Sequence, residues 1–174
     1  MSTETTITLV GFVGAVLFVL LMQIRENMPE QSGYQTQWAA QFFAAAELTR
    51  RGYQVALTLG NAVYTDLMVE SPSGHHFDVD VKGQSTKGFW IVKKRTPDDN
   101  RYFILVYVPR DSDEAPQYFI LSSIEMENLI VQERDESRNK RENQGKIWDP
   151  NDNRFSGIKW TKAFEYKDWM ILPK

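Results

Sequence analysis

Two aspartates and a lysine lie within a segment whose pattern is typical of a β-hairpin. The segment spans residues 64–84, and the Ser-Pro-Ser-Gly sequence inside it has the composition of a turn. If the two arms pair symmetrically about Ser73, Asp66 lies opposite Asp80, with Cα atoms about 4.5–5.5 Å apart. Lys82 follows Asp80 by two residues, so the two side chains share one face of their strand.

The same pairing sorts the other hairpin residues by polarity. Residues two apart in a strand share a face, so one face is expected to be apolar and the other polar. The apolar face consists of Leu67, Val69, Phe77, Val79 and Val81. The opposite face adds Met68, Glu70, Asp78 and Gln84 to the two aspartates and the lysine.

Metal-dependent hydrolysis of a phosphodiester bond is the chemistry that these residue types favour. Two carboxylates that face each other repel, and a divalent cation between them converts the repulsion into binding free energy. Mg²⁺ (or Mn²⁺) is expected, because it is a hard ion that one or two carboxylates hold together with substrate phosphate. The ammonium of Lys82 could stabilise the attacking hydroxide or the transition state. The alternative interpretation is an ordinary polar face on which Lys82 bridges its neighbours.

Apolar periodicity predicts the elements that position this hairpin. An alanine-rich helix is expected over 34–51, followed by Gly52 and a strand over 53–59. Strands are also expected at 89–93, 102–108 and 117–121, and the capping-box spacing of Ser122 and Glu125 predicts a helix that continues to about Gln132. The mixed charges at 133–146 predict a solvated loop or frayed helix, and the aromatic residues at 148–169 predict packing that closes the domain. The fold class is therefore α/β.

The sequence resembles the PD-(D/E)XK nuclease superfamily. The similarity rests on Asp66-x13-Asp80-Val81-Lys82 and on the order of elements, in which a helix ending Glu-Leu-Thr-Arg-Arg-Gly-Tyr precedes a strand and the hairpin. The resemblance implies a restriction-endonuclease-like fold over residues 33–174, with a mixed central sheet flanked by helices, and a nuclease that acts on DNA. It also implies that Asp66, Asp80 and the carbonyl of Val81 bind Mg²⁺ or Mn²⁺ and that Lys82 is the catalytic lysine. Gln84 corresponds to a polar residue that helps to hold the site or the DNA.

The resemblance is incomplete at two positions. Thr65 stands where the superfamily name has proline. Resolvase-like members have a glutamate on the first helix, and Gln41 occupies that place here, able to orient a water or a metal ligand without adding charge. Glu47 lies six residues later, about 240° around the helix, and is expected to meet Arg50 and Arg51 or solvent.

Basic residues after the motif are candidates for contacts with DNA phosphates, and Trp90 lies among them. A solvated edge strand protected by lysines would show the same pattern. These basic residues are Lys87, Lys93, Lys94 and Arg95.

The first part of the chain has a different character. Residues 7–24 carry no charge and are long enough to span a bilayer, so we expect a single transmembrane helix between a tail (1–6) and a linker (25–32). Basic residues after the span place the body of the protein on the cytoplasmic side. Gly11 and Ala15 could bring two such helices together as a homodimer. If translation starts at Met28, the protein is instead cytoplasmic.

The composition of the chain narrows the possible classes of function. A chain with 42% hydrophobic and 25% charged residues is not wholly disordered, and the absence of cysteine excludes disulfides, thiolate zinc sites and cysteine nucleophiles. The net charge of -3 argues against a binder that relies on bulk positive charge. Three functions remain: a metal-dependent nuclease, a catalytically inactive member of the same fold that serves as a membrane-tethered binding or scaffold module, and an α/β interaction domain.

Overall fold

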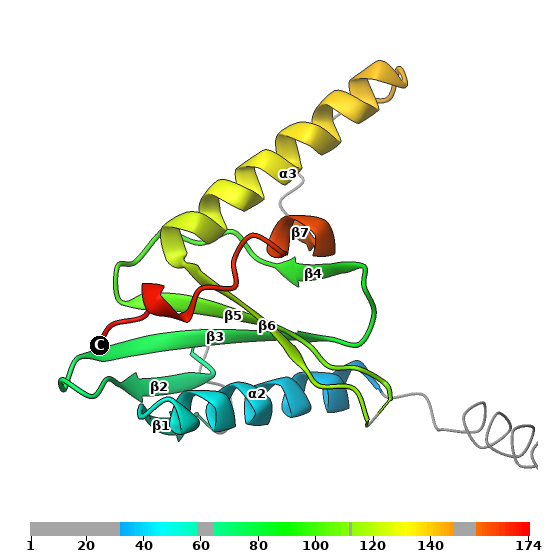
Figure 1. Cartoon of the computed structure of the whole chain (residues 1–174). Helices are drawn as coiled ribbons and strands as arrows, with labels where there is room; N and C mark the ends of the chain where they lie inside the picture. The colour runs from blue at the N-terminus through cyan, green and yellow to red at the C-terminus, as the bar shows by residue number, and fades with distance from the viewer. Residues whose placement is uncertain (1–31, 59–64, 112, 148–155) are drawn as a thin grey trace, which may run out of the picture. The chain divides into compact units, whose positions relative to one another are not determined.

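A five-stranded mixed sheet forms the centre of the computed structural model, which describes residues 32–58, 65–111, 113–147 and 156–174 (Figure 1). The strand order is β1-β2-β3-β5-β6, and every neighbouring pair is antiparallel except β3 and β5, which are parallel. The strands are β1 (Gln54–Leu57), β2 (Leu67–Glu70), β3 (His76–Gln84), β5 (Arg101–Tyr107) and β6 (Gln117–Ser122). The predicted mixed central sheet flanked by helices is confirmed.

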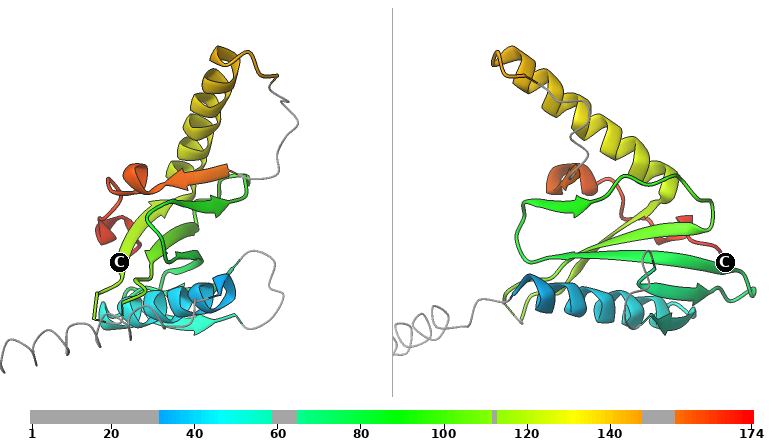
Figure 2. Two further views of the ribbon diagram at one scale, coloured as in Figure 1. Left: turned by 90° about the vertical axis from the view of Figure 1, so that its right-hand side faces the viewer. Right: turned by 180° about the vertical axis from the view of Figure 1, so that it is seen from behind.

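Helix α2 (Gly33–Arg50) lies along one face of this sheet, whereas α3 (Ser123–Asn143) packs on the other side through its first turns and then projects away from the sheet (Figure 2). Helix α2 begins at a capping box formed by Ser32 and Gln35. Helix α3 begins at the predicted capping box of Ser122 and Glu125. It continues well past the predicted end near Gln132, and the charged segment after that point is helical. A two-stranded sheet of β4 (Phe89–Val92) and β7 (Ser156–Lys159) leads into α4 (Trp160–Ala163), and η1 (Trp169–Ile171) lies near the C-terminus.

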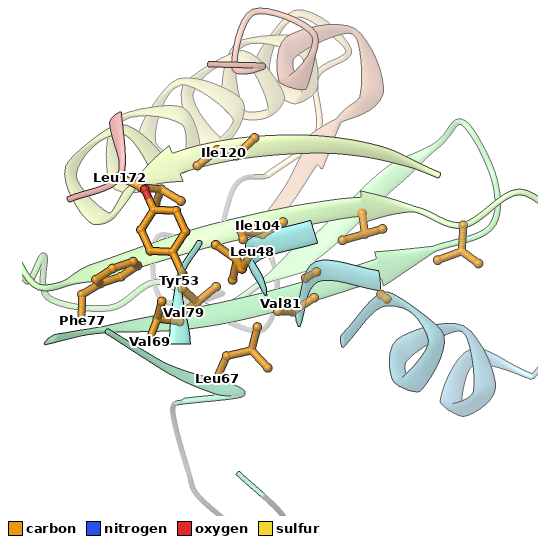
Figure 3. Packing of buried hydrophobic residues seen from close by; sticks show 14 residues of the cluster. Leu48, Tyr53, Leu67, Val69, Phe77, Val79, Val81, Ile104, Ile120 and Leu172 are labelled. Carbon is orange, nitrogen blue, oxygen red and sulfur yellow. The ribbon is translucent and has the colours of Figure 1, made fainter. Parts of the chain in front are cut away.

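Two hydrophobic clusters lie on opposite faces of the sheet. The cluster beneath α2 contains all five residues of the predicted apolar face of the hairpin: Leu67, Val69, Phe77, Val79 and Val81 (Figure 3). Its α2 members are Ala40, Ala44 and Leu48, so short side chains let the helix lie close to the sheet. The cluster on the α3 side contains Trp90, Phe103, Leu105, Phe119 and Trp160, among others. The aromatic tail therefore packs as predicted where it is described.

The hairpin has the predicted register within its ladder. Leu67 pairs with Val79 and Val69 pairs with Phe77, in antiparallel strands. Asp66 precedes the first ladder pair, so the expected direct pairing with Asp80 is not part of the ladder. Its backbone N–H instead donates to the carbonyl of Val79, at 3.1 Å.

The expected transmembrane helix, the tail before it and residues 25–31 of the linker lie outside the described residues. Among the helices that the structure describes, none is long and apolar enough to cross a membrane.

Candidate functional site

The candidate site is built where β3 continues beyond its neighbour β2. In the described part of the chain, β2 begins opposite Val79, whereas β3 runs on to Gln84. Side chains replace the missing strand along this edge: Asp66 Oδ2 accepts a hydrogen bond from the Val81 N–H at 2.7 Å, and Gln37 Nε2 donates to the Val81 carbonyl at 2.7 Å. Gln37 Oε1 also accepts from the Gly83 N–H at 2.9 Å. The backbone N–H and C=O groups of β3, which need hydrogen-bond partners, therefore bond to polar side chains along this edge.

Asp66 is fixed from both sides. Gln41, on α2, donates from Nε2 to Asp66 Oδ1 at 2.7 Å, so the residue expected at the place of the glutamate does reach the site. The Thr58 N–H donates to the Asp66 carbonyl at 3.0 Å and so ties the end of β1 to the same peptide. Each oxygen of the Asp66 carboxylate thus accepts one hydrogen bond, from α2 and from β3.

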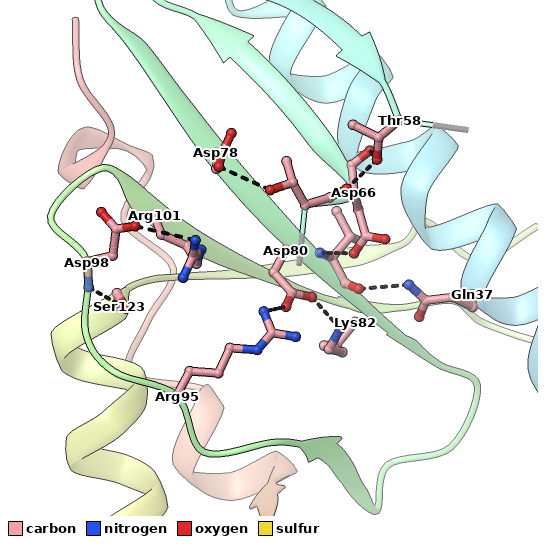
Figure 4. Close-up of polar contacts among 12 residues, drawn as sticks. Gln37, Thr58, Asp66, Asp78, Asp80, Lys82, Arg95, Asp98, Arg101 and Ser123 are labelled. Carbon is pink, nitrogen blue, oxygen red and sulfur yellow. Dashed lines mark hydrogen bonds and ion pairs between the residues drawn. The ribbon is translucent and has the colours of Figure 1, made fainter. Parts of the chain in front are cut away.

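Asp80 is a buried carboxylate between two cations. Its relative exposure is 2%. Lys82 Nζ pairs with Asp80 Oδ1, and Arg95 Nη1 donates to Asp80 Oδ2 at 2.7 Å (Figure 4). Lys82 and Arg95 are themselves mostly shielded, with side-chain exposures of 26% and 19%. The part of the polar face around Asp80 is therefore a shielded ionic cluster and not a freely solvated surface.

The two carboxylates influence each other. Burial raises the pKa of Asp66 above its usual range, although the hydrogen bond from the Val81 N–H opposes this effect. Repulsion from Asp80 raises the pKa of Asp66 further, and the charge of Lys82 lowers it. Ionisation of Asp66 is thus less favourable here than for an ordinary aspartate, and a divalent cation beside the carboxylate would oppose this effect.

Close packing of α2 on β3 depends on Gly83. A Cβ added at Gly83 would lie 2.6 Å from Ala40 Cβ and 2.7 Å from the carbonyl oxygen of Thr36. Any larger residue would push the helix outward and carry Gln37 and Gln41 away from β3 and Asp66. Gly83 is therefore a structural requirement of the site.

Three residues of this arrangement were not predicted as parts of the site. Gln37 lies four residues before the predicted Gln41, so it shares a face of the helix with a residue already assigned to the site. Gly83 directly follows Lys82, but a glycine in a strand indicates a close approach without identifying the partner. Arg95 was predicted to contact DNA, and nothing in the sequence pattern connects it with Asp80.

The other predicted residues are distributed unevenly around the site. Gln84 ends β3, and its Nε2 is buried without a hydrogen-bond partner among the described residues. Lys94 pairs with Glu127 at 2.9 Å, and Lys87 lies over the rings of Tyr107 and Trp160. Trp90, which lies among these basic residues in the sequence, is 1% exposed and packs in the core. Glu47 pairs with Arg50 and Arg51, as expected.

Among the described residues, two carboxylates meet at the site, those of Asp66 and Asp80. Within the described ranges, no group of three or more histidine, aspartate or glutamate side chains is placed to hold a metal ion. The available oxygen donors are the carboxylates of Asp66 and Asp80 and the carbonyl of Val81, which already accepts from Gln37.

Comparisons with known proteins add no evidence about the candidate site. No family model matches the chain. No curated protein matches it either. Among solved structures, a bacterial homing endonuclease is similar over 52% of this chain and 65% of its own, less than two thirds of its length, with 23% sequence identity and a TM-score of 0.38. A likeness this loose carries no argument about the site.

Proposed function

We propose that this protein is a metal-dependent nuclease of the PD-(D/E)XK superfamily that hydrolyses phosphodiester bonds of DNA. The observation that carries the proposal is the convergence of Asp66, Asp80 and Lys82 where β3 extends beyond β2. The motif spacing suggested these three residues, and each has an electrostatic contact with another of them.

The donor set fits a hard divalent cation. Asp66, Asp80 and the Val81 carbonyl supply only oxygen, which Mg²⁺ and Mn²⁺ prefer. Positive charge at this place would also oppose the repulsion that raises the pKa of Asp66. When bound, such an ion would acidify a coordinated water and neutralise charge that develops on the phosphate.

The chain's own residues have separate roles in this proposal. Gln41 holds the Asp66 carboxylate, and Gln37 holds the Val81 carbonyl, so both donor groups are oriented from α2. Lys82 places an ammonium beside Asp80, where it stabilises negative charge on the reacting phosphate. Gln84 adds an amide group with unused hydrogen-bonding capacity at the end of the same strand.

A second candidate function is a catalytically inactive member of the same fold that acts as a binding or scaffold module. Two observations favour it. Both oxygens of Asp80 already pair with cations, and a neutral glutamine stands where resolvase-like members have an acid. The two candidates differ in whether added metal produces cleavage.

The test uses the full-length chain with single-stranded, duplex and branched DNA, with and without Mg²⁺ or Mn²⁺. We expect cleavage only with metal, and its loss in Asp80→Asn together with strongly weakened Mn²⁺ binding in a calorimetric titration. Asp78→Asn is the matched control, because Asp78 lies on the same strand and accepts from Thr65 Oγ1 at 3.0 Å, away from Lys82 and Arg95. Equal Mn²⁺ binding by the wild type and Asp80→Asn would refute the metal site, and metal binding without cleavage would favour the inactive module.

We also propose that residues 7–24 anchor the protein in a membrane, with the nuclease-like domain in the cytoplasm. The support is the uncharged run itself and the basic residues after it. Full-length protein in its native host should then sediment with membranes and resist carbonate extraction. A protein that begins at Met28, or one that fractionates as soluble with Met1 intact, would refute the anchor.

A further inference from the structure

Among the residues that the structure describes, the charges of Asp66, Asp80, Lys82 and Arg95 balance without a metal ion. Asp66 and Asp80 supply two negative charges when ionised, and Lys82 and Arg95 supply two positive charges. A divalent cation would leave this cluster with an excess of two positive charges. Lys82 or Arg95 is therefore expected to weaken metal binding unless its charged group moves away from the Asp80 carboxylate.

The two cations differ in how they reach Asp80. Lys82 belongs to β3 itself, and its backbone is paired with β5 opposite Leu105. Arg95 belongs to the segment 93–100, which contains no helix or strand and connects β4 to β5. Figure 4 shows its side chain extending from this segment toward the Asp80 carboxylate. The side chain that would carry the Arg95 guanidinium away from Asp80 is long and starts from this irregular segment. The Lys82 side chain starts from a paired position of β3, two residues from Asp80 on the same strand.

We propose that Arg95 takes the place of the metal ion beside Asp80 in the metal-free protein and moves to a DNA phosphate when metal and DNA bind. This inference rests on the proposed function. The guanidinium suits both partners, because its planar set of N–H donors matches carboxylate and phosphate oxygens alike. The exchange replaces one anionic partner of Arg95 by another and frees Asp80 Oδ2 for the ion. Arg95 would thus oppose metal binding in the absence of DNA and support DNA binding in its presence.

These two roles predict opposite effects of one substitution. Arg95→Gln removes the charge and keeps an amide N–H that can still donate to Asp80. Mn²⁺ binding without DNA should become tighter, because a unit charge within about 4–6 Å changes the pKa of a carboxyl by about 1–3 units and should change the affinity for an ion by at least about tenfold. The KM for DNA should rise by a similar factor, because a phosphate contact is lost.

The experiment measures the Kd of Mn²⁺ by electron paramagnetic resonance of the free ion, with full-length protein and no DNA, followed by cleavage kinetics. Lys94→Gln is the matched control: it removes the adjacent positive charge, which pairs with Glu127 and not with Asp80, and should leave the Mn²⁺ Kd unchanged. Arg95→Lys retains the charge, so it should bind Mn²⁺ about as the wild type does. It keeps the test valid if the glutamine variant does not fold.

The outcomes separate this inference from the proposed function. Tighter Mn²⁺ binding in Arg95→Gln with a raised KM supports the exchange. Mn²⁺ binding that is unchanged or weaker in this variant, while Asp80→Asn abolishes it, overturns the exchange and leaves the metal site intact. If Arg95→Gln does not fold, tighter Mn²⁺ binding in Arg95→Lys overturns the exchange, because the competing charge is still present. Absence of Mn²⁺ binding in the wild type and in both Arg95 variants overturns the proposed function.

Discussion

Replacing Gly83 by alanine should damage both the fold and the site. The added methyl group would approach Ala40 Cβ to 2.6 Å and the Thr36 carbonyl oxygen to 2.7 Å. Neither atom can rotate away, because one is a Cβ and the other belongs to the helix backbone, so α2 must move. Overpacking of this kind costs about 1–3 kcal/mol, and we expect the upper part of that range, or roughly 10 °C in Tm for a unit of this size.

Urea unfolding of the full-length chain, followed by circular dichroism, measures this loss. Gly33→Ala is the matched control, since an added Cβ at Gly33 meets nothing within 4 Å and the residue lies at the start of the same helix. Gly83→Ala should also weaken Mn²⁺ binding, because displacement of α2 moves Gln37 and Gln41. A loss below about 0.5 kcal/mol with an unchanged Mn²⁺ Kd would refute the close approach of α2 to β3.

Three further predictions concern the charged groups of the site. Lys82→Met should abolish cleavage and lower the free energy of unfolding by about 1–3 kcal/mol, because Asp80 loses one of its cations; cleavage at the wild-type rate would contradict the role of Lys82. The raised pKa of Asp66 means that the folded state holds this proton more tightly than the unfolded chain does, so the contribution of Asp66 to the free energy of unfolding of the metal-free protein should fall as pH rises from about 4 through that pKa. Urea titrations across this range should show the wild type losing stability relative to Asp66→Asn as pH rises, and a difference that does not change with pH would contradict the assignment. Gln41→Glu should tighten Mn²⁺ binding in a calorimetric titration and destabilise the metal-free fold, because it exchanges a hydrogen-bond donor for a third carboxylate; weaker binding would argue against a metal beside Asp66.

Local patterns in the sequence were sufficient for the strands and helices up to the start of α3 and for one face of the hairpin, whereas β7 and α4 in the aromatic tail were not predicted. Alternation of polarity placed Leu67 opposite Val79 and Val69 opposite Phe77, because a slip by one residue would have exchanged the apolar face for the polar one. The capping box at Ser122 marked the start of α3 for an equally local reason. The end of α3 could not be predicted, because charged residues that favour solvent also form good helices, and neither property fixes where a helix stops.

The surroundings of the site required knowledge of tertiary structure. Periodicity assigned Asp80 to a polar face but could not show that the segment before β5 returns over that face and buries it beneath Arg95. The glutamines of α2 show the same limit. Gln41 was identified through a resemblance, whereas Gln37 makes two hydrogen bonds to β3 that only the packing of the helix reveals.

The alternation along β3 also limits how this protein can change in evolution. Phe77, Val79 and Val81 contribute to the core beneath α2, and the residues between them carry the charged groups. Insertion or deletion of a single codon within the strand would invert this assignment for every later residue, placing valines among the ions and an aspartate in the apolar core. Length variation among descendants of this gene should therefore be confined to the turn before β3 and the segment after it, while β3 itself varies by substitution alone.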